Sequence, residues 1–432
     1  MNRRYFLMSS AAATATQAVR ANPSPNDTVR VAVVGCGGRG SSHMNAWTSL
    51  PNVELAALVD VDDSHAERYI GQLQRKNLKP VPTFRDIRKV LDDKNIDAVS
   101  IATPNHWHTL QTIWACQAGK DVYVEKPCSH NVFESKQIVA AARKYGRMVQ
   151  QGSQSRSSGA LREAVQKMRD GEFGEVYMAR GLCYKFRNTI GKTPVEAVPP
   201  GVDYDMWTGP APLRPFTKNR FHYNWHWFWD TGNGDLGNQG IHEVDIARWG
   251  LGVTHPTKVS AFGGKFMFDD DQETPNTITA SYDFVVNGRP KLMTFEVRHW
   301  YSNHEAGIGG EKAGNTIGNT FYGSNGYLVI DGYNKYWSHM GKDGAPGPAR
   351  SERETHFENF INAVRSRKRE TLHAEIEDGA QSCVLVHLAN ISYRLGRTLN
   401  WDEKSWTVKG DKEATEMLTR KYRAPYVVPE KV

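Results

Sequence analysis

At 432 residues the chain exceeds the size of one ordinary hydrophobic core, which predicts about two or three domains. Hydrophobic residues make up 39% and charged residues 23%, and no apolar run approaches the roughly 18 residues of a membrane-spanning helix, which excludes disordered and transmembrane classes. The net charge of +7 comes from scattered Lys and Arg, so we expect no nucleic-acid partner. Five cysteines without a CxxC pair or metal spacing argue against a disulfide framework.

The first 21 residues resemble a twin-arginine export signal. The sequence RRYFL at positions 3–7 is followed by a Ser/Ala/Thr tract, and residues 19–21 fit a small-residue cleavage site. We therefore expect residues 1–21 to be removed and the mature protein to be exported already folded, periplasmic or secreted, with no stable membrane insertion after cleavage. The alternative is an Ala-rich terminus with an accidental arginine pair.

Residues 27–155 are predicted to form a Rossmann NAD-binding domain, because strands and helices alternate there. The apolar, β-branched runs that predict strands are 29–34, 53–59, 98–102, 122–124 and 148–151. The segments with helical character are 43–50, 109–118 and 133–145. Such alternation predicts parallel βαβ units, and hence a doubly wound parallel sheet in a protein of the α/β class.

The pattern changes after about Gln154, where long strands replace the alternation. The expected strands are 175–184, 258–268, 277–286 and 291–300, with Asn287-Gly288 as a hairpin turn between the last two. We predict a substrate-binding α+β domain at 156–365, with a large, mostly antiparallel open sheet. Residues 366–432 are predicted to form C-terminal helices and a tail that packs back on the core.

A glycine-rich loop follows the first strand and opens a helix, which favours dinucleotide binding over a plain turn. In GCGGRG, Gly35 permits the tight turn, Gly37 lets the backbone approach a pyrophosphate and Gly40 allows close helix packing. Asp60 ends the second strand and supplies acceptors for two ribose hydroxyls. A 2′-phosphate would be repelled there, so the predicted cofactor is NAD, with NADP less favoured.

Three further motifs occur in a fixed order: ATPNHWH at 102–108, VEKP at 124–127 and GIHEVD at 240–245. Together with the glycine loop, they make the chain resemble the Gfo/Idh/MocA oxidoreductases from about residue 29 to residue 397. The resemblance places Lys126 beside the nicotinamide and the reacting carbinol, and makes His242 the proton acceptor. A hydride leaves carbon only if the hydroxyl proton also leaves, so a base is required. The alternative is a surface lysine and a packed helix histidine.

Asn238 departs from the family pattern, because many of its dehydrogenases carry an aspartate four residues before the histidine. Asparagine can hold a hydroxyl but cannot accept its proton, so the proton acceptor should be His242 or another group such as Tyr184. The catalytic candidates are therefore Lys126, His242, Asn238 and Tyr184.

The predicted cofactor-binding residues are Gly35, Gly37, Gly38, Arg39, Gly40, Asp60, Thr103, Pro104, Asn105, His108, Glu125, Lys126 and Gln154. The predicted substrate-binding residues are Lys126, Arg156, Tyr184, Trp225, His226, Asn238 and His242. The aromatic tract RFHYNWHWFWD at 220–230 suits the apolar faces of sugar rings, or else forms core or an oligomer interface. The acidic run at 269–273 fits a solvated loop better than a metal site, so no metal is predicted.

An exported enzyme has no pool of NAD to exchange with, so we expect the cofactor to stay bound. The sequence therefore predicts an NAD(P)-dependent oxidoreductase that transfers hydride to or from a ring carbon of a sugar or glycoside. One alternative is a redox-neutral glycosidase that oxidises a ring carbon transiently and eliminates the aglycone. Another is a secreted sugar-binding protein that retains NAD without catalysis. By analogy, the open sheet predicts a homo-oligomer.

Overall fold

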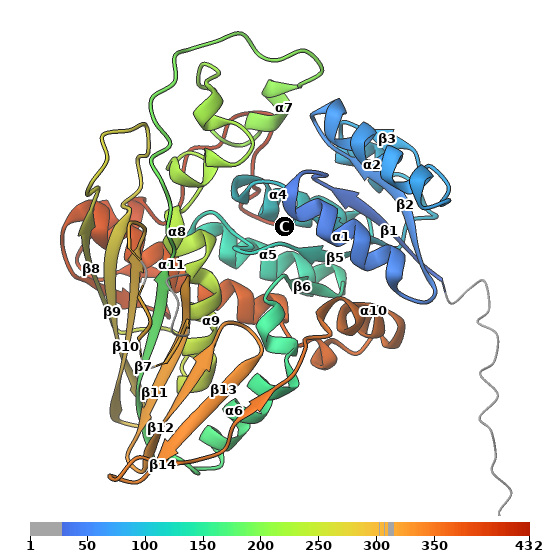
Figure 1. Cartoon of the computed structure of the whole chain (residues 1–432). Helices are drawn as coiled ribbons and strands as arrows, with labels where there is room; N and C mark the ends of the chain where they lie inside the picture. The colour runs from blue at the N-terminus through green and yellow to red at the C-terminus, as the bar shows by residue number, and fades with distance from the viewer. Residues whose placement is uncertain (1–27, 302, 306, 310–314) are drawn as a thin grey trace, which may run out of the picture.

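The computed structural model describes residues 28–301, 303–305, 307–309 and 315–432, which two sheets organise into two neighbouring halves (Figure 1). The predicted export signal lies outside the described residues. The α/β fold class is confirmed, with a parallel sheet in the N-terminal half and a larger mixed sheet beyond it. None of the described helices is both long enough and apolar enough to cross a bilayer.

The first sheet is parallel throughout, with strand order β3-β2-β1-β4-β5-β6. Its strands are β1 Val29–Val34, β2 Val53–Val59, β3 Thr83–Phe84, β4 Ala98–Ile101, β5 Asp121–Val124 and β6 Val149–Gln151. Its helices are α1 Gly38–Ser49, α2 Asp63–Arg75, α3 Ile87–Leu91, α4 Asn105–Gln117 and α5 Val132–Tyr145. Every residue of β4 and β5 is buried, because helices cover both faces of this sheet. The order reverses between β1 and β4, where doubly wound sheets bind ligands.

The second sheet is antiparallel except where β7 and β10 run parallel, in the order β14-β13-β12-β11-β7-β10-β9-β8-β16-β17. Its strands are β7 Val176–Tyr184, β8 Lys258–Gly264, β9 Thr277–Val286, β10 Arg289–Arg298, β11 Thr316–Gly323, β12 Gly326–Asp331, β13 Lys335–Met340, β14 Ala345–Pro346, β15 Arg350–Ser351, β16 Leu399–Asp402 and β17 Thr407–Val408. The sequence analysis missed β11, β12 and β13. It also missed that β16, from the C-terminal segment, pairs with β8 and so extends this sheet.

The predicted hairpin between β9 and β10 is confirmed. Asn287 and Gly288 form a two-residue turn, and both have positive φ, 52° and 78°. Such a turn matches the right-handed twist of the strands that it joins. In β10 the predicted alternation also holds, because Met293, Phe295 and Val297 are buried while the residues between them are half-buried.

Helices cover one face of the second sheet and join it to the first (Figure 1). The remaining helices are α6 Gly159–Arg169, α7 Tyr204–Thr208, α8 Gly234–Asn238, α9 Gly240–Leu251, α10 His356–Ser366, α11 Ile376–Leu395 and α12 Lys412–Glu416. Of these, α10 packs on the first sheet, where Phe360 shares a core with Val31 and Trp47. The helix α9 packs on β7, β10 and β11, and α11 contacts both β8 and α5. Because α11 lies against both halves, it helps to hold them in a fixed relation.

Residues 185–231, which we call the strap, connect β7 to α8 by way of the first domain, and the loop passes over the top of Figure 1. The strap is tied there by backbone hydrogen bonds. Asp203 N–H donates to the Val61 carbonyl at 2.8 Å, and Asp63 N–H donates to the Gly201 carbonyl at 3.2 Å. The strap therefore bridges the two halves on the side where β1 and β2 end.

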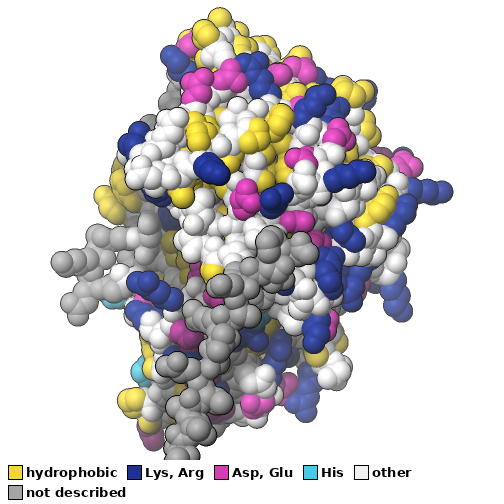
Figure 2. Space-filling view, turned by 90° about the vertical axis from the view of Figure 1, so that its right-hand side faces the viewer, with side chains coloured by type: hydrophobic (Ala, Val, Ile, Leu, Met, Phe, Trp, Pro, Cys, Tyr) yellow, Lys and Arg dark blue, Asp and Glu magenta, His cyan; other side chains and the backbone are white. Residues whose placement is uncertain are grey.

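Figure 2 shows one face of the molecule, on which Lys and Arg side chains are interspersed with Asp and Glu. This face carries no continuous basic field, which is consistent with the scattered charges in the sequence.

Candidate active site

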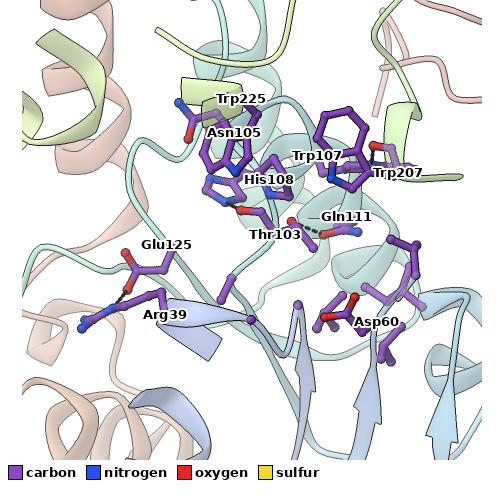
Figure 3. Close-up of a pocket in the computed structure, with 18 of the residues that line it drawn as sticks. Arg39, Asp60, Thr103, Asn105, Trp107, His108, Gln111, Glu125, Trp207 and Trp225 are labelled. Atoms are coloured by element: carbon purple, nitrogen blue, oxygen red, sulfur yellow. Dashed lines mark hydrogen bonds and ion pairs between the residues drawn. The ribbon is translucent and has the colours of Figure 1, made fainter. Parts of the chain in front are cut away.

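A cavity of about 330 Å³ opens where β1 and β4 end, and the glycine loop forms part of its wall (Figure 3). Gly35 has φ +87°, and a Cβ there would lie 2.7 Å from the Ala102 carbonyl oxygen. A Cβ on Gly40 would lie 1.8 Å from the Gly35 carbonyl oxygen. Both positions therefore require glycine, and the compact loop presents its backbone and the start of α1 to the cavity. This arrangement fits a pyrophosphate.

Asp60 lines the cavity directly after β2 (Figure 3). Its carboxylate accepts hydrogen bonds from Cys36 N–H at 2.6 Å and Asp62 N–H at 2.9 Å, and the His65 ring nitrogen lies 3.2 Å away. These contacts hold the carboxylate beside the loop, in the position where a ribose would present its hydroxyls.

Glu125 anchors the far side of the glycine loop. Arg39 Nε donates to its carboxylate at 2.8 Å, and the His43 ring nitrogen lies 2.9 Å from the same oxygen. Although burial raises the pKa of Glu125, the charge of Arg39 and the contact with His43 hold that pKa well below its usual value. Arg39 thus supports the loop through an ion pair, as the dashed line in Figure 3 shows.

The motif at 102–108 joins the cavity to the loop after β5. The ring nitrogens of His108 lie 2.7 Å from the carbonyl oxygens of Thr103 and Pro127. Asn105 donates to the side-chain oxygen of Asn233 at 3.0 Å. The four predicted cofactor-binding residues of this motif, Thr103, Pro104, Asn105 and His108, all line the cavity.

Lys126 lies at the end of the cavity nearest the second domain. Its ammonium donates to the Asn238 backbone carbonyl at 2.5 Å, which links the loop after β5 to the end of α8. Burial lowers the pKa of Lys126, although Glu125 opposes the effect. Lys126 is therefore a hydrogen-bond donor in a poorly solvated position where the two domains meet.

His242 lies in the first turn of α9 and is buried. Burial lowers its pKa well below 6.5, and the charge of Lys126 acts in the same direction. Its Nδ1 has no hydrogen-bond partner among the described residues, while its ring lies 5.0 Å from that of Tyr333. His242 is not among the residues that line the cavity, and its unpartnered Nδ1 is buried. A neutral imidazole near the charge of Lys126 still has the chemistry of a proton acceptor.

Asp235 is a central residue of the site that the sequence analysis missed. It is fully buried in α8, where Arg187 donates to both of its oxygens at 2.8 and 3.0 Å. The His299 ring nitrogen lies 2.9 Å away, and the Asn238 side chain donates at 3.1 Å. Burial raises the pKa of Asp235, but Arg187 and His299 hold it well below its usual value. The signal in the sequence was an acidic residue in the short segment GDLGN, just before the histidine motif.

The structure corrects the placement of two predicted residues. Tyr184 lies on the face of β7 opposite to Cys183, whose sulfur is 3.8 Å from Asp235, and its hydroxyl donates to Glu296 at 2.7 Å. It therefore points away from Lys126 and His242, because successive strand residues face opposite sides. Arg156 is bound by both oxygens of Asp245 at 2.7 and 2.9 Å, so it holds helix α9 rather than a substrate.

Gln154 lies behind the cavity, because its side-chain nitrogen donates to the Tyr123 hydroxyl at 2.9 Å and lies 3.4 Å from Glu125. In this conformation its contact with the predicted cofactor site runs through Glu125. Gln154 is not among the residues that line the cavity.

The aromatic tract serves two purposes. Phe221 and Trp225 pack with Tyr204, Trp207 and Phe216 in a small core within the strap. Four members of the tract line the cavity, namely His222, Tyr223, His226 and also Trp225, which belongs to both groups. The two sequence interpretations, core and ligand contact, therefore each describe part of the tract.

The prediction that the protein holds no metal remains a prediction. Asp62, His65 and His222 bring possible ligand atoms within 4.8 Å of one another, at the adenosine end of the predicted dinucleotide site. In the structure, the His222 ring nitrogen lies 2.9 Å from an Asp62 oxygen, which accounts for this contact without an ion.

Two family descriptions match the chain. "Oxidoreductase family, NAD-binding Rossmann fold" matches residues 29–153. "Oxidoreductase family, C-terminal alpha/beta domain" matches residues 174–283 and 331–428. The matches cover both halves of the structure and the segments that carry Lys126 and His242.

Among curated proteins, the chain is 32% identical over 170 residues to a glycosyl hydrolase family 109 protein of a Shewanella strain. It is also 32% identical over 169 residues to an alpha-N-acetylgalactosaminidase of Shewanella oneidensis. Each alignment covers 33% of this chain and 37% of the relative, so the chain spans little more than a third of these relatives.

Among solved structures, the fold resembles the WlbA dehydrogenase of Bordetella pertussis in complex with NADH and UDP-GlcNAcA, with TM-score 0.63 and 20% identity over 87% of this chain and 99% of the other. Levoglucosan dehydrogenase in complex with NADH and L-sorbose gives TM-score 0.65 and 18% identity over 86% and 98%. At these identities the similarity shows the fold alone.

Proposed function

This chain belongs to the Gfo/Idh/MocA family of oxidoreductases and is an NAD(P)-dependent enzyme. From that premise, we propose that it transfers hydride to or from a ring carbon of a sugar or glycoside. The observation that carries the proposal is Lys126, which lines the cavity and donates to the Asn238 carbonyl at 2.5 Å, four residues before His242. Family membership sets aside the alternative of a non-catalytic sugar-binding protein.

The bound dinucleotide supplies the hydride acceptor or donor. Lys126 binds the reacting oxygen, because its ammonium projects into the cavity and already donates to a carbonyl there. His242 accepts the hydroxyl proton through an imidazole nitrogen when the ring carbon is oxidised, and returns the proton when it is reduced. Burial keeps His242 neutral, so it is ready to accept that proton near neutral pH.

Because position 238 is asparagine, the site has to accept the hydroxyl proton without a carboxylate at that position. Asn238 contributes its backbone carbonyl to Lys126 and its side chain to Asp235. Asp235 itself is held by Arg187 on both oxygens and by His299, so it positions these groups and remains ionised. The proton acceptor is therefore His242, and Asn238 and Asp235 act as positioning residues.

We infer that NAD is favoured over NADP because of two acidic side chains, Asp60 and Asp63, at the ribose end of the cavity. The Asp60 carboxylate would repel a 2′-phosphate. Two arginines line the cavity and both form ion pairs, Arg85 with Asp63 and Arg39 with Glu125. A phosphate there would have to displace such a partner, whereas ribose hydroxyls would simply donate to Asp60.

The strap supports the proposal that the enzyme retains its cofactor and is exported with it. Trp207, Tyr223 and Trp225 come from the strap to line the cavity, and the strap is hydrogen-bonded to the first domain at Val61 and Asp63. Release of the dinucleotide would require these contacts to open. Export through the twin-arginine route, and a homo-oligomer built on the open sheet, remain predictions.

A second candidate is a redox-neutral glycosidase, favoured by the names of the curated relatives, glycosyl hydrolase family 109 protein and alpha-N-acetylgalactosaminidase. In that cycle, oxidation of a ring hydroxyl acidifies a neighbouring C–H. A base then removes that proton, the aglycone leaves with its bonding electron pair, water adds, and the carbonyl is reduced again. His242 would be the base for the C–H proton once it has released the hydroxyl proton to solvent, since Tyr184 points to the opposite face of β7.

The two candidates are separated by offering sugars and chromogenic glycosides to the purified protein, as isolated and after loading with NAD. Growth of the reduced-nicotinamide absorbance band identifies an oxidoreductase, and aglycone release without that growth identifies the glycosidase. Either activity should fall at least about a hundredfold in Lys126→Ala and persist in the matched control Lys136→Ala, which removes an exposed lysine of α5. Activity that survives Lys126→Ala would refute the assignment.

A further inference from the structure

Two lysine ammonium groups reach the same short segment between α8 and α9. Lys126 donates to the Asn238 carbonyl at 2.5 Å, and Lys185, from the start of the strap, donates to the Gln239 side-chain oxygen at 2.8 Å. Neither ammonium forms an ion pair with a carboxylate in the part of the chain that the structure describes. Each lysine therefore carries a charge that the protein does not neutralise by direct contact.

The acidic groups around this segment are already engaged or neutral. Asp235 is bound on both oxygens by Arg187, and Glu125 forms an ion pair with Arg39. Burial raises the pKa of Glu243 to about 8, so its carboxyl, 3.3 Å from the Gln239 amide, is largely protonated near neutral pH. The site beside His242 thus keeps a surplus of positive charge.

Lys185 faces the interior of this site. It follows Tyr184 at the end of β7, so its side chain lies on the same face as Cys183 and Asp235. Its charge acts on both Lys126 and His242, lowering the pKa of each. A negative group bound at Lys185 would therefore lie within electrostatic range of the predicted catalytic pair.

We propose that Lys185 and Gln239 form a subsite for a monoanionic group on the sugar, a carboxylate or a sulfate ester, which lies beside the ring carbon held at Lys126. The inference rests on the proposed function and names the substrate class of the same site. Lys185 supplies the cation. The Gln239 side-chain oxygen now faces Lys185 and its nitrogen donates to Tyr333, so the bound anion would displace that oxygen and gain the nitrogen as a second donor when the amide turns.

A monoanion suits this subsite better than a phosphate. Lysine binds as a single point charge, whereas phosphate dianions are usually bound by forks of arginine donors. The fork of Arg187, which lies beside Asp235 at this site, is occupied by that carboxylate. The neutral sugars leave the charges of Lys126 and Lys185 uncompensated, so they should bind more weakly.

The test uses matched pairs of methyl glycosides: a hexoside, the corresponding uronide, the 6-sulfate and the 6-phosphate. Binding is measured by quenching of tryptophan fluorescence in the cofactor-loaded full chain, and turnover is measured separately as reduced nicotinamide or released alcohol. We expect the uronide or the sulfate to bind about 10- to 100-fold more tightly than the hexoside. Lys185→Met should remove that difference, while Lys258→Met, an exposed lysine of β8, should keep it.

The outcomes separate this inference from the proposed function. Equal binding of neutral and anionic partners, or an anionic preference that survives Lys185→Met, would overturn the subsite even if sugars are oxidised. Preference for the 6-phosphate alone would also overturn it. A Lys185-dependent preference without reduced nicotinamide or released alcohol would support the subsite and overturn the proposed function.

Discussion

Replacing Asp235 by asparagine tests whether this buried carboxylate holds the catalytic end of the site together. The side chain of Asp235 is fully buried and that of Arg187 is 16% exposed, so the Asp235→Asn variant leaves a nearly buried guanidinium without its bidentate partner. Breaking a buried ion pair by removing one partner typically costs about 3–5 kcal/mol. Because Arg187 retains some solvent contact, we expect the lower part of that range, about 3 kcal/mol of unfolding free energy.

The assay is equilibrium denaturation followed by tryptophan fluorescence. Trp227 should report on this region, because the centre of its ring lies 5.0 Å from the Arg187 guanidinium. The control is Asp269→Asn, whose partner Lys192 is exposed, and there we expect less than about 1 kcal/mol. The double variant Asp235→Asn with Arg187→Met should recover part of the loss, because it removes the unpaired charge.

The pH dependence gives a second check on Asp235. Its pKa is depressed in the folded state, so the carboxylate stabilises the fold above the unfolded value of about 3.8 and loses this effect as pH falls through the folded pKa. The difference between wild type and Asp235→Asn should therefore be constant from about pH 5 to 8 and shrink only in stronger acid. A difference below about 1 kcal/mol at pH 7 would refute the structural role.

Three further predictions concern the cofactor loop, cofactor choice and the base. Gly40→Ala should lower dinucleotide affinity at least about tenfold and destabilise the fold, because the new Cβ would lie 1.8 Å from the Gly35 carbonyl oxygen. The control is Gly38→Ala, whose Cβ meets nothing within 4 Å, and its midpoint of thermal denaturation should match that of the wild type. Asp60→Ala should reduce the preference for NAD over NADP by about tenfold or more in binding titrations, and an unchanged ratio would contradict the role of its charge. The pKa of His242 is depressed, so the base form persists as pH falls and the acidic limb of kcat/KM should lie below pH 6.5; a limb above that value would contradict this assignment.

Several features were predictable because they depend on neighbouring residues. The loop after β1 needs glycine at positions 35 and 40 for reasons of backbone geometry, and Asp60 follows its strand directly. The β9–β10 hairpin is likewise predictable from Asn287-Gly288 and from the alternation of apolar and polar residues that flanks it.

The motifs predicted Lys126 and His242 as site residues, but only the fold brings the segments that carry them together. Their relation depends on α8 and α9 lying against the loop after β5, where Lys126 reaches the Asn238 carbonyl across 112 residues of sequence. No local pattern specifies such a contact, because it arises from the packing of two domains.

Taken alone, the sequence determined the two kinds of sheet, the dinucleotide loop and the family motifs, since each rests on short-range periodicity or turn chemistry. Only the tertiary structure decided which polar groups meet. Asp235 joins Arg187 and His299 across 48 and 64 residues, and Lys185 reaches Gln239 across 54. The same cause explains Tyr184: one step along β7 turns a side chain to the opposite face, so its place depended on how the strand is seated in the sheet.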